Sequence, residues 1–270
     1  MARPGLPTRP GLPTTDSPVL VLAAHGSRDV RFAATSERVT DAVRRALPGV
    51  RVELAYLDLN VPLLDDVLDA LDGEVVVVPL LFGDGFHSKT DLPAMLEAAR
   101  LRNPRLRPVQ TPIVGRYSPV PALIERLEQA LGRTPSAHTG DGVLLYAVGS
   151  SDPASDASIH ERGRELAAVL GVPVHTVFAT RLGRDGAVMA AATDYLRACG
   201  ARQLVASPLF LSAGLLTERV ERELDAVWPG ATVAGPIGEH PSLIAAIARL
   251  YRDAVPRAMQ VGAPAPAGLG

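Results

Sequence analysis

The chain has 270 residues, of which 47% are hydrophobic and 21% charged, a composition typical of a globular protein of about two domains. Its single cysteine, Cys199, excludes disulfides, a Cys₄ zinc site and a cysteine-held iron–sulfur cluster within one chain, and it predicts a soluble protein of the reducing cytosol. A formal net charge of −2, an aromatic content of 4% and short apolar runs argue against a nucleic-acid surface and a membrane span.

Both ends of the chain are predicted to be disordered. Residues 3–8 and 9–14 repeat the hexapeptide Arg-Pro-Gly-Leu-Pro-Thr, whose prolines prevent the apolar helix of a signal peptide. We therefore assign residues 1–17 to a disordered N-terminal segment. The tail, residues 256–270, is rich in alanine, proline and glycine, and we interpret it in the same way.

Short apolar runs alternate with amphipathic segments over residues 18–131. Strands are predicted at Val19–Ala24, Val50–Leu57, Val75–Phe82 and Leu106–Gln110. Helices are predicted at Arg31–Leu47, at Pro62–Leu71, from about Asp91, and at Pro119–Leu131. This alternation predicts an α/β fold, in which a four-stranded parallel sheet carries helices on both faces. We expect the doubly wound strand order 2-1-3-4.

The same pattern restarts after a polar linker at residues 132–141. Within residues 142–255, Val143–Val148 corresponds to the first strand, Val174–Thr180 to the second, and Ser207–Phe210 to part of the third. Such self-similarity indicates a duplicated unit. The chain is therefore predicted to contain two homologous doubly wound domains.

The duplication allows the titratable residues of the two halves to be compared. The first half has His25, Asp58 and His87 where the second half has Val148, Thr180 and Leu216, respectively. Residues that shape turns, such as Gly149 and Asp152, are shared with the first half. A purely structural role for both histidines would not predict this joint difference. We therefore assign the chemistry to the first half.

Topology should bring the two histidines of the first half together. His25 directly follows the first strand, and His87 lies five residues beyond Phe82, after the third strand. Ligands of doubly wound sheets bind beyond the carboxyl ends of the strands, where the strand order reverses. Both imidazoles should therefore reach one ligand, and Asp58, at the end of the second strand, should be able to join or orient them.

Imidazole binds borderline divalent metals such as Fe²⁺, Co²⁺ and Ni²⁺, and it is neutral enough at pH 7 to accept a proton. Two such ligands at an otherwise open site suit delivery of a metal better than its storage. A single histidine at a strand end is more often a hydrogen-bonded structural residue. Two on one rim, both replaced in the other half, favour a functional role.

Two motifs resemble those of the sirohydrochlorin chelatases, which are class II tetrapyrrole chelatases, in the long form with two fused domains. They are His25-Gly26-Ser27-Arg28-Asp29 and Gly85-Phe86-His87-Ser88-Lys89-Thr90-Asp91-Leu92-Pro93. The resemblance runs from about Val19 to Ala254. It implies insertion of Fe²⁺ or Co²⁺ into sirohydrochlorin, for siroheme or cobalamin, with His25 and His87 holding the metal and assisting proton removal. Asp58 is similar to the acidic residue, often glutamate, that ends the second strand in this family. The resemblance implies no cofactor beyond the substrate metal.

The carboxylates of such a ring should meet backbone N–H groups and cations beside the histidines. The candidate substrate-binding residues are Gly26, Ser27, Arg28, Gly85, Ser88, Lys89 and Thr90. Arg28 and Lys89 are the candidate cations, with an ordinary solvated charge as the alternative for each. Ser27 either binds a carboxylate or caps the following helix, and capping is favoured. Gly26, Gly83 and Gly85 are expected to allow close backbone approach or a positive φ.

Three other interpretations stay open. A histidine phosphatase also presents His-Gly after a first strand, but it needs an arginine immediately before the histidine, where this chain has Ala24. A metal or tetrapyrrole carrier would have the same ligand pair without turnover. A purely structural pair of domains would leave the one-sided loss of titratable groups unexplained. Two fused halves are compatible with either a monomer or a homodimer.

Overall fold

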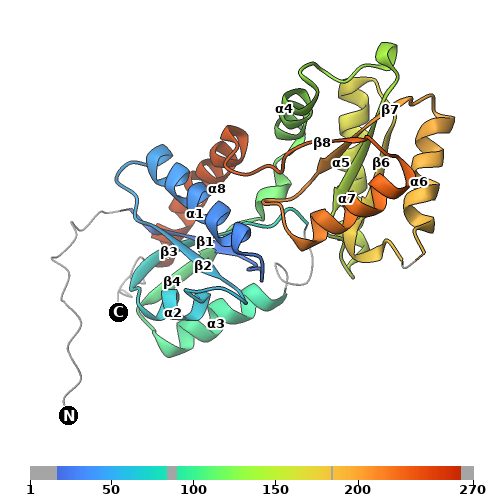
Figure 1. Ribbon diagram of the computed structural model, residues 1–270. Coiled ribbons are helices and arrows are strands. Elements are labelled where there is room, and N and C mark those ends of the chain that lie inside the picture. The colour runs from blue at the N-terminus through green and yellow to red at the C-terminus, as the bar shows by residue number, and fades with distance from the viewer. Residues whose placement is uncertain (1–16, 84–89, 184, 263–270) are drawn as a thin grey trace, which may run out of the picture.

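The computed structural model describes residues 17–83, 90–183 and 185–262 (Figure 1). The first half contains strands β1 (Val19–Ala24), β2 (Val52–Tyr56), β3 (Gly73–Pro79) and β4 (Leu106–Gln110). Its helices are α1 (Val30–Ala46), α2 (Leu64–Asp69), α3 (Leu92–Arg102), the 3₁₀ turn η2 (Val114–Arg116) and α4 (Val120–Leu131). The strand order is β2-β1-β3-β4 and every pairing is parallel, as the sequence predicts.

The second half repeats this arrangement. Its strands are β5 (Asp141–Ala147), β6 (Val174–Phe178), β7 (Gln203–Pro208) and β8 (Thr232–Val233), in the parallel order β6-β5-β7-β8. Its helices are η3 (Ala137–Thr139), α5 (Pro153–Leu170), η4 (Ala179–Arg181), α6 (Ala187–Ala198), α7 (Leu215–Val227) and α8 (Pro241–Gly262). The prediction of two homologous doubly wound sheets is confirmed.

Strand periodicity divides the core of each half between the two faces of its sheet. In β1, Leu20 and Leu22 face α1, whereas Val21 and Ala23 face α2 and α3. In the second half, α6 and α7 cover one face of the sheet, and α5 covers the other. All of these strand residues are fully buried, because parallel sheets are covered on both faces.

The last helix of each half packs on the sheet of the other half. Helix α4, at the end of the first repeat, contacts β7, β8 and α5, and α8, at the end of the second, contacts β3, β4 and α1. Figure 1 shows α8 beside α1 and α4 beside the second sheet. By sequence, α4 therefore belongs to the first half and α8 to the second, but each packs on the sheet of the other half.

The linker and the tail both carry structure. The buried carboxylate of Asp141 accepts hydrogen bonds from the Arg133 side chain, the Ser136 N–H and the Thr139 hydroxyl, so it fixes the linker at residues 132–141. Helix α8 continues through Pro256 to Gly262, although the sequence predicted disorder from residue 256. The expectation was wrong over residues 256–262, because burial of apolar side chains on the first sheet outweighs the missing proline N–H. The rest of the predicted tail, and all but one residue of the predicted N-terminal segment, lie outside the described residues.

Among the described helices, none combines the length and the apolar character that crossing a membrane requires.

Candidate functional site

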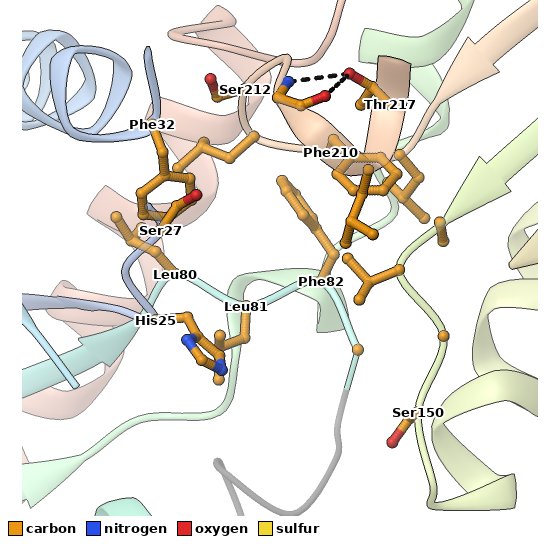
Figure 2. A pocket seen from close by; sticks show the side chains of 18 of the residues that line it. His25, Ser27, Phe32, Leu80, Leu81, Phe82, Ser150, Phe210, Ser212 and Thr217 are labelled. Carbon is orange, nitrogen blue, oxygen red and sulfur yellow. Dashed lines mark hydrogen bonds between the residues drawn. The ribbon is translucent and has the colours of Figure 1, made fainter. Parts of the chain in front are cut away.

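A cavity of about 670 Å³ lies between the two halves, at the carboxyl ends of their strands (Figure 2). Residues from the first half that line it are His25, Gly26, Ser27, Arg28, Phe32, Leu59, Leu80, Leu81, Phe82 and Gly83. The second half contributes residues 147–151, 155, 156, 159 and 209–217. Strand β3 ends at Pro79, three residues before the predicted end, so that residues 80–83 leave the sheet and enter this wall. The cavity lies at the edge of the sheet where the topology predicts a ligand to bind.

His25 lies on the first-half wall of this cavity, directly after β1. Its side chain is half-buried, and its carbonyl oxygen accepts a hydrogen bond of 3.0 Å from the Asp58 N–H. Gly26 follows with φ +101°, and a Cβ there would lie 1.8 Å from the Asp58 carbonyl oxygen. Only glycine fits this approach, because a side chain is disfavoured by the positive φ and excluded by the neighbouring backbone. The turn after His25 is thus pressed against the end of β2.

Ser27 belongs to the same turn rather than to the helix cap. Its N–H donates to the Asn60 side chain at 2.7 Å, and its hydroxyl accepts from the Asp29 N–H at 3.1 Å. Asp29 is the residue that caps α1, by accepting from the Arg31 N–H. The favoured expectation that Ser27 caps the helix was therefore wrong, because the helix begins two residues later than that role requires.

The second half has the same turn without the imidazole. The Thr180 N–H donates to the Val148 carbonyl at 3.1 Å, as Asp58 does to His25. Gly149 has φ +90°, and Asp152 caps α5. These bonds establish in three dimensions the equivalence of His25 with Val148 and of Asp58 with Thr180. The backbone is shared, and the titratable side chains differ.

The remaining predicted site residues fall into three groups. Arg28 is exposed and lines the cavity, and Thr90 is exposed just before α3. Asp58 is exposed, and its carboxylate accepts from the Leu59 N–H at 2.7 Å. Gly85, His87, Ser88 and Lys89 lie outside the described residues. The meeting of His25 with His87 therefore stays a prediction, and the described residues contain no cluster of three or more His, Cys, Asp or Glu that could hold a metal ion.

The sequence did not predict the apolar walls of the cavity. Phe82 from the first half and Phe210 from the second both project into it (Figure 2). Phe210 also packs on the buried Tyr146 ring, with centroids 5.8 Å apart. Leu215 lines the cavity from the start of α7 and is largely exposed. Phe82 and Phe210 fall at the ends of predicted strand segments, and nothing in their spacing marks them as facing a cavity.

An ion-pair network links the two halves next to the turn that follows His25. The Arg31 guanidinium lies 2.5 Å from the Asp29 carboxylate and 2.6 Å from that of Glu218, at the start of α7. The hydrogen bonds from Arg31 hold the pKa of Asp29 at about 2, well below its usual value, and those from Asp29 and Glu218 raise the pKa of Arg31. The network lies beside the His25 turn, because Asp29 ends that turn.

The other histidines lie elsewhere. The His240 ring is buried between the Glu125 carboxylate and the Ser242 hydroxyl, each at 2.8 Å. His160 packs edge-on against Phe178, and burial lowers the pKa of His175. His138 is exposed in η3. None of these four lines the cavity between the halves.

The family model described as CbiX matches the chain twice, over residues 19–130 and 142–254. The chain belongs to the CbiX family. The two matches coincide with the duplication and with the resemblance drawn from the two motifs, which is confirmed.

Named relatives agree with this CbiX assignment. A sirohydrochlorin cobaltochelatase of Priestia megaterium is 24% identical over 214 residues, which are 75% of this chain and 67% of that protein. A sirohydrochlorin ferrochelatase of the same organism is 24% identical over 236 residues, or 83% of this chain and 85% of that protein.

Solved structures share the fold of this CbiX chain. SirB from Bacillus subtilis subspecies spizizenii, a sirohydrochlorin chelatase in complex with cobalt, has a TM-score of 0.72 at 21% identity, covering 89% of this chain and 96% of SirB. SirB from Bacillus subtilis with Fe³⁺ has a TM-score of 0.73 at 22% identity, covering 90% of this chain and 98% of that one.

Proposed function

We propose that this protein is a sirohydrochlorin chelatase, a lyase that inserts Fe²⁺ or Co²⁺ into the macrocycle. The observation that carries the proposal is an imidazole, His25, on the wall of an apolar cavity between the halves of a CbiX chain. A volume of about 670 Å³ lies in the range of cofactor-sized sites. The relatives named cobaltochelatase and ferrochelatase support both the activity and the two metals.

Metal insertion requires that two pyrrole N–H protons leave the ring while the ion loses its water. A neutral imidazole supplies what both steps need, since it donates a lone pair to the ion or accepts a proton. We assign these roles to His25 and His87 together. Asp58 raises the basicity of an imidazole by accepting a hydrogen bond from it.

The two halves divide the binding of the macrocycle. Apolar residues of both halves, among them Phe82 and Phe210, provide surfaces for the faces of the ring. The carboxylates of the ring bind to polar residues of the first half. We assign them to Gly26, Ser27, Arg28, Gly85, Ser88, Lys89 and Thr90.

The choice of metal follows the relatives. Their names support Co²⁺ and Fe²⁺ as substrates, and Ni²⁺ is a third candidate on ligand chemistry alone. The product would enter siroheme or cobalamin synthesis according to the metal. One chain provides both walls of the cavity, which favours a monomer over a homodimer. The single cysteine favours the cytoplasm as the compartment.

The alternatives lack comparable support. A histidine phosphatase needs a cation next to the histidine, and Ala24 is fully buried there. A metal or tetrapyrrole carrier has the same cavity and differs only in turnover. The test is therefore to mix protein, sirohydrochlorin and Fe²⁺, Co²⁺ or Ni²⁺ without oxygen and follow the absorption of the free base. We expect that band to disappear faster than without protein, and a rate equal to the uncatalysed one would reject the proposal in favour of a carrier.

Variants of the histidines test the assignment of the site. We expect His25→Ala and His87→Ala each to lower the rate of chelation at least a hundredfold, because each removes a metal ligand and proton acceptor. The matched control is His138→Ala, since His138 is exposed outside the cavity. Circular dichroism should show all three variants folded. Chelation by either cavity variant at near the wild-type rate would contradict the roles given to the pair.

A further inference from the structure

The loop after β2 contains the only non-glycine residue with a positive φ among the described residues. Leu59 has φ +66°, and the Asn60 N–H donates to the Asp58 carbonyl across it at 2.8 Å, which makes a γ-turn. Leucine is disfavoured in this left-handed conformation, because its Cβ approaches the following carbonyl oxygen. The surrounding bonds hold the turn nonetheless. The Asp58 carboxylate accepts from the Leu59 N–H, and the Asn60 side chain accepts from the Ser27 N–H.

The second half shows that the fold does not require this strained turn. There the chain runs into the 3₁₀ turn η4 (Ala179–Arg181), with negative φ at its residues. The N–H of Ser150, the counterpart of Ser27, is satisfied by the Asp156 carboxylate. Arg181, the counterpart of Leu59, donates to the Ser150 carbonyl and pairs with Asp156. The two halves therefore share one fold but differ in this turn. The backbone is unstrained in the second half, which lacks the imidazole, and strained in the first half beside His25.

The strained conformation places an apolar side chain at the cavity. Leu59 lines the cavity, yet 49% of its surface remains exposed. The turn is bonded at both ends to the residues around His25, through the Asp58 N–H and the Asn60 side chain. A strained residue that persists in one half only, next to a functional side chain, is the pattern expected of a functional constraint.

We infer that Leu59 is a substrate-contacting residue, whose side chain packs on the macrocycle and positions it against His25. The inference rests on the proposed function for the identity of the macrocycle. The exposed part of the side chain becomes buried when the ring binds, and this burial stabilises the complex. The strained backbone of the turn fixes the direction in which the Leu59 side chain points.

Three substitutions distinguish the contribution of the Leu59 side chain to binding from the effect of backbone strain at this position. Leu59→Ala removes most of the contact, Leu59→Asn removes it with a residue that tolerates a left-handed φ, and Leu59→Met keeps an apolar side chain of similar volume. Absorption titration with metal-free sirohydrochlorin gives the Kd, and initial rates give KM and kcat. We expect the alanine and asparagine variants to raise Kd and KM about fivefold and to keep kcat within twofold of wild type. The reason is that each loses the burial of about half a leucine side chain against the ring. The methionine variant should bind as wild type does, and the asparagine variant should melt at or above the wild-type temperature.

The matched control is Leu101→Ala, because Leu101 is 76% exposed on α3 and does not line the cavity. A Kd within twofold of wild type for both Leu59→Ala and Leu59→Asn would overturn the inference, and so would an equal weakening by Leu101→Ala. The titration needs no turnover. A wild-type protein that binds sirohydrochlorin but inserts no metal would therefore refute the proposed function, while the Kd values still decide the role of Leu59.

Discussion

Replacing Gly26 with alanine tests the closest backbone approach in the site. Gly26 has φ +101°, and an added Cβ would lie 1.8 Å from the Asp58 carbonyl oxygen and 2.9 Å from its carbon. Those atoms are backbone, held by the bond from the Asp58 N–H to the His25 carbonyl, so they cannot rotate away as a side chain would. The turn that carries His25 must shift instead.

The expected cost has two parts. A left-handed conformation costs a non-glycine residue about 1–2 kcal/mol, and forcing a methyl group into filled space adds about 1–3 kcal/mol. The free energy of unfolding should therefore fall by about 2–5 kcal/mol, and the melting temperature by about 5–15 °C. Because the shift displaces the imidazole, we expect kcat/KM for metal insertion to fall about a hundredfold.

Two other glycines serve as controls in the same assays of thermal unfolding and anaerobic chelation. Gly49 has φ +85° and open space around its Cβ position, so Gly49→Ala should cost only the conformational part, about 1–2 kcal/mol. Gly149, the counterpart of Gly26, would meet the Thr180 and Phe178 side chains at 2.8 and 2.9 Å. Gly149→Ala should destabilise the fold and leave turnover within tenfold of wild type, since no imidazole precedes it. If Gly26→Ala were no less stable than Gly49→Ala, the approach to the Asp58 carbonyl would be refuted.

Two further predictions concern the linker and the last helix. Hydrogen bonds from Arg133 and its neighbours lower the pKa of Asp141 to about 2 from its usual 3.8, so its contribution to stability is present above about pH 4 and is lost as the pH falls toward 2. Asp141→Asn should cost about 2 kcal/mol at pH 7, and its difference from wild type in urea unfolding should shrink as the medium is acidified; a difference that does not change with pH would contradict this. Ala258 is fully buried in α8, and Ala258→Asp should lower the free energy of unfolding by about 3 kcal/mol or more, whereas Arg257→Asp at an exposed position should change it by less than about 1 kcal/mol. Equal melting temperatures for these two variants would show that α8 does not pack on the first sheet.

The sequence predicted those features that repeat along the chain. The alternation of apolar runs with helices indicated two parallel sheets, because strands buried on both faces are apolar throughout, and the order 2-1-3-4 was the one expected of the doubly wound fold. Aligning the two halves paired His25 with Val148 and Asp58 with Thr180, and the matching backbone bonds at the ends of β1 and β5 bear this out. The motif that begins at His25, directly after β1, lies on the first-half wall of the cavity.

Other features depend on which element packs against each helix or strand face, and the hydrophobic pattern of the sequence does not specify that partner. The amphipathic pattern of α4 predicted that one of its faces is buried, but not that α4 and α8 each pack on the other half's sheet. Leu59 carries no signal of its left-handed φ, since leucine is not a residue that marks such turns. Phe210 looks like core by composition, and only the closeness of the two halves turns it toward a cavity.

The exchange of α4 and α8 has a consequence for how the cavity can work. Full separation of the two sequence repeats would strip α4 from the second sheet and α8 from the first, and so would expose apolar side chains such as the fully buried Leu127 and Ile247. Each such side chain costs about 1.5–3 kcal/mol to expose, so full separation of the repeats is strongly disfavoured, whereas a motion that carries each sheet together with its exchanged helix leaves these contacts intact. The bond from Arg126 on α4 to the Ile237 carbonyl holds α4 on the second half, and the ion pair of Arg31 with Glu218 links α1 of the first half to α7 of the second. Under the proposed function, a planar macrocycle must therefore reach the cavity without full separation of the repeats, past lining side chains such as Leu59 and Leu215 that are 49% and 65% exposed.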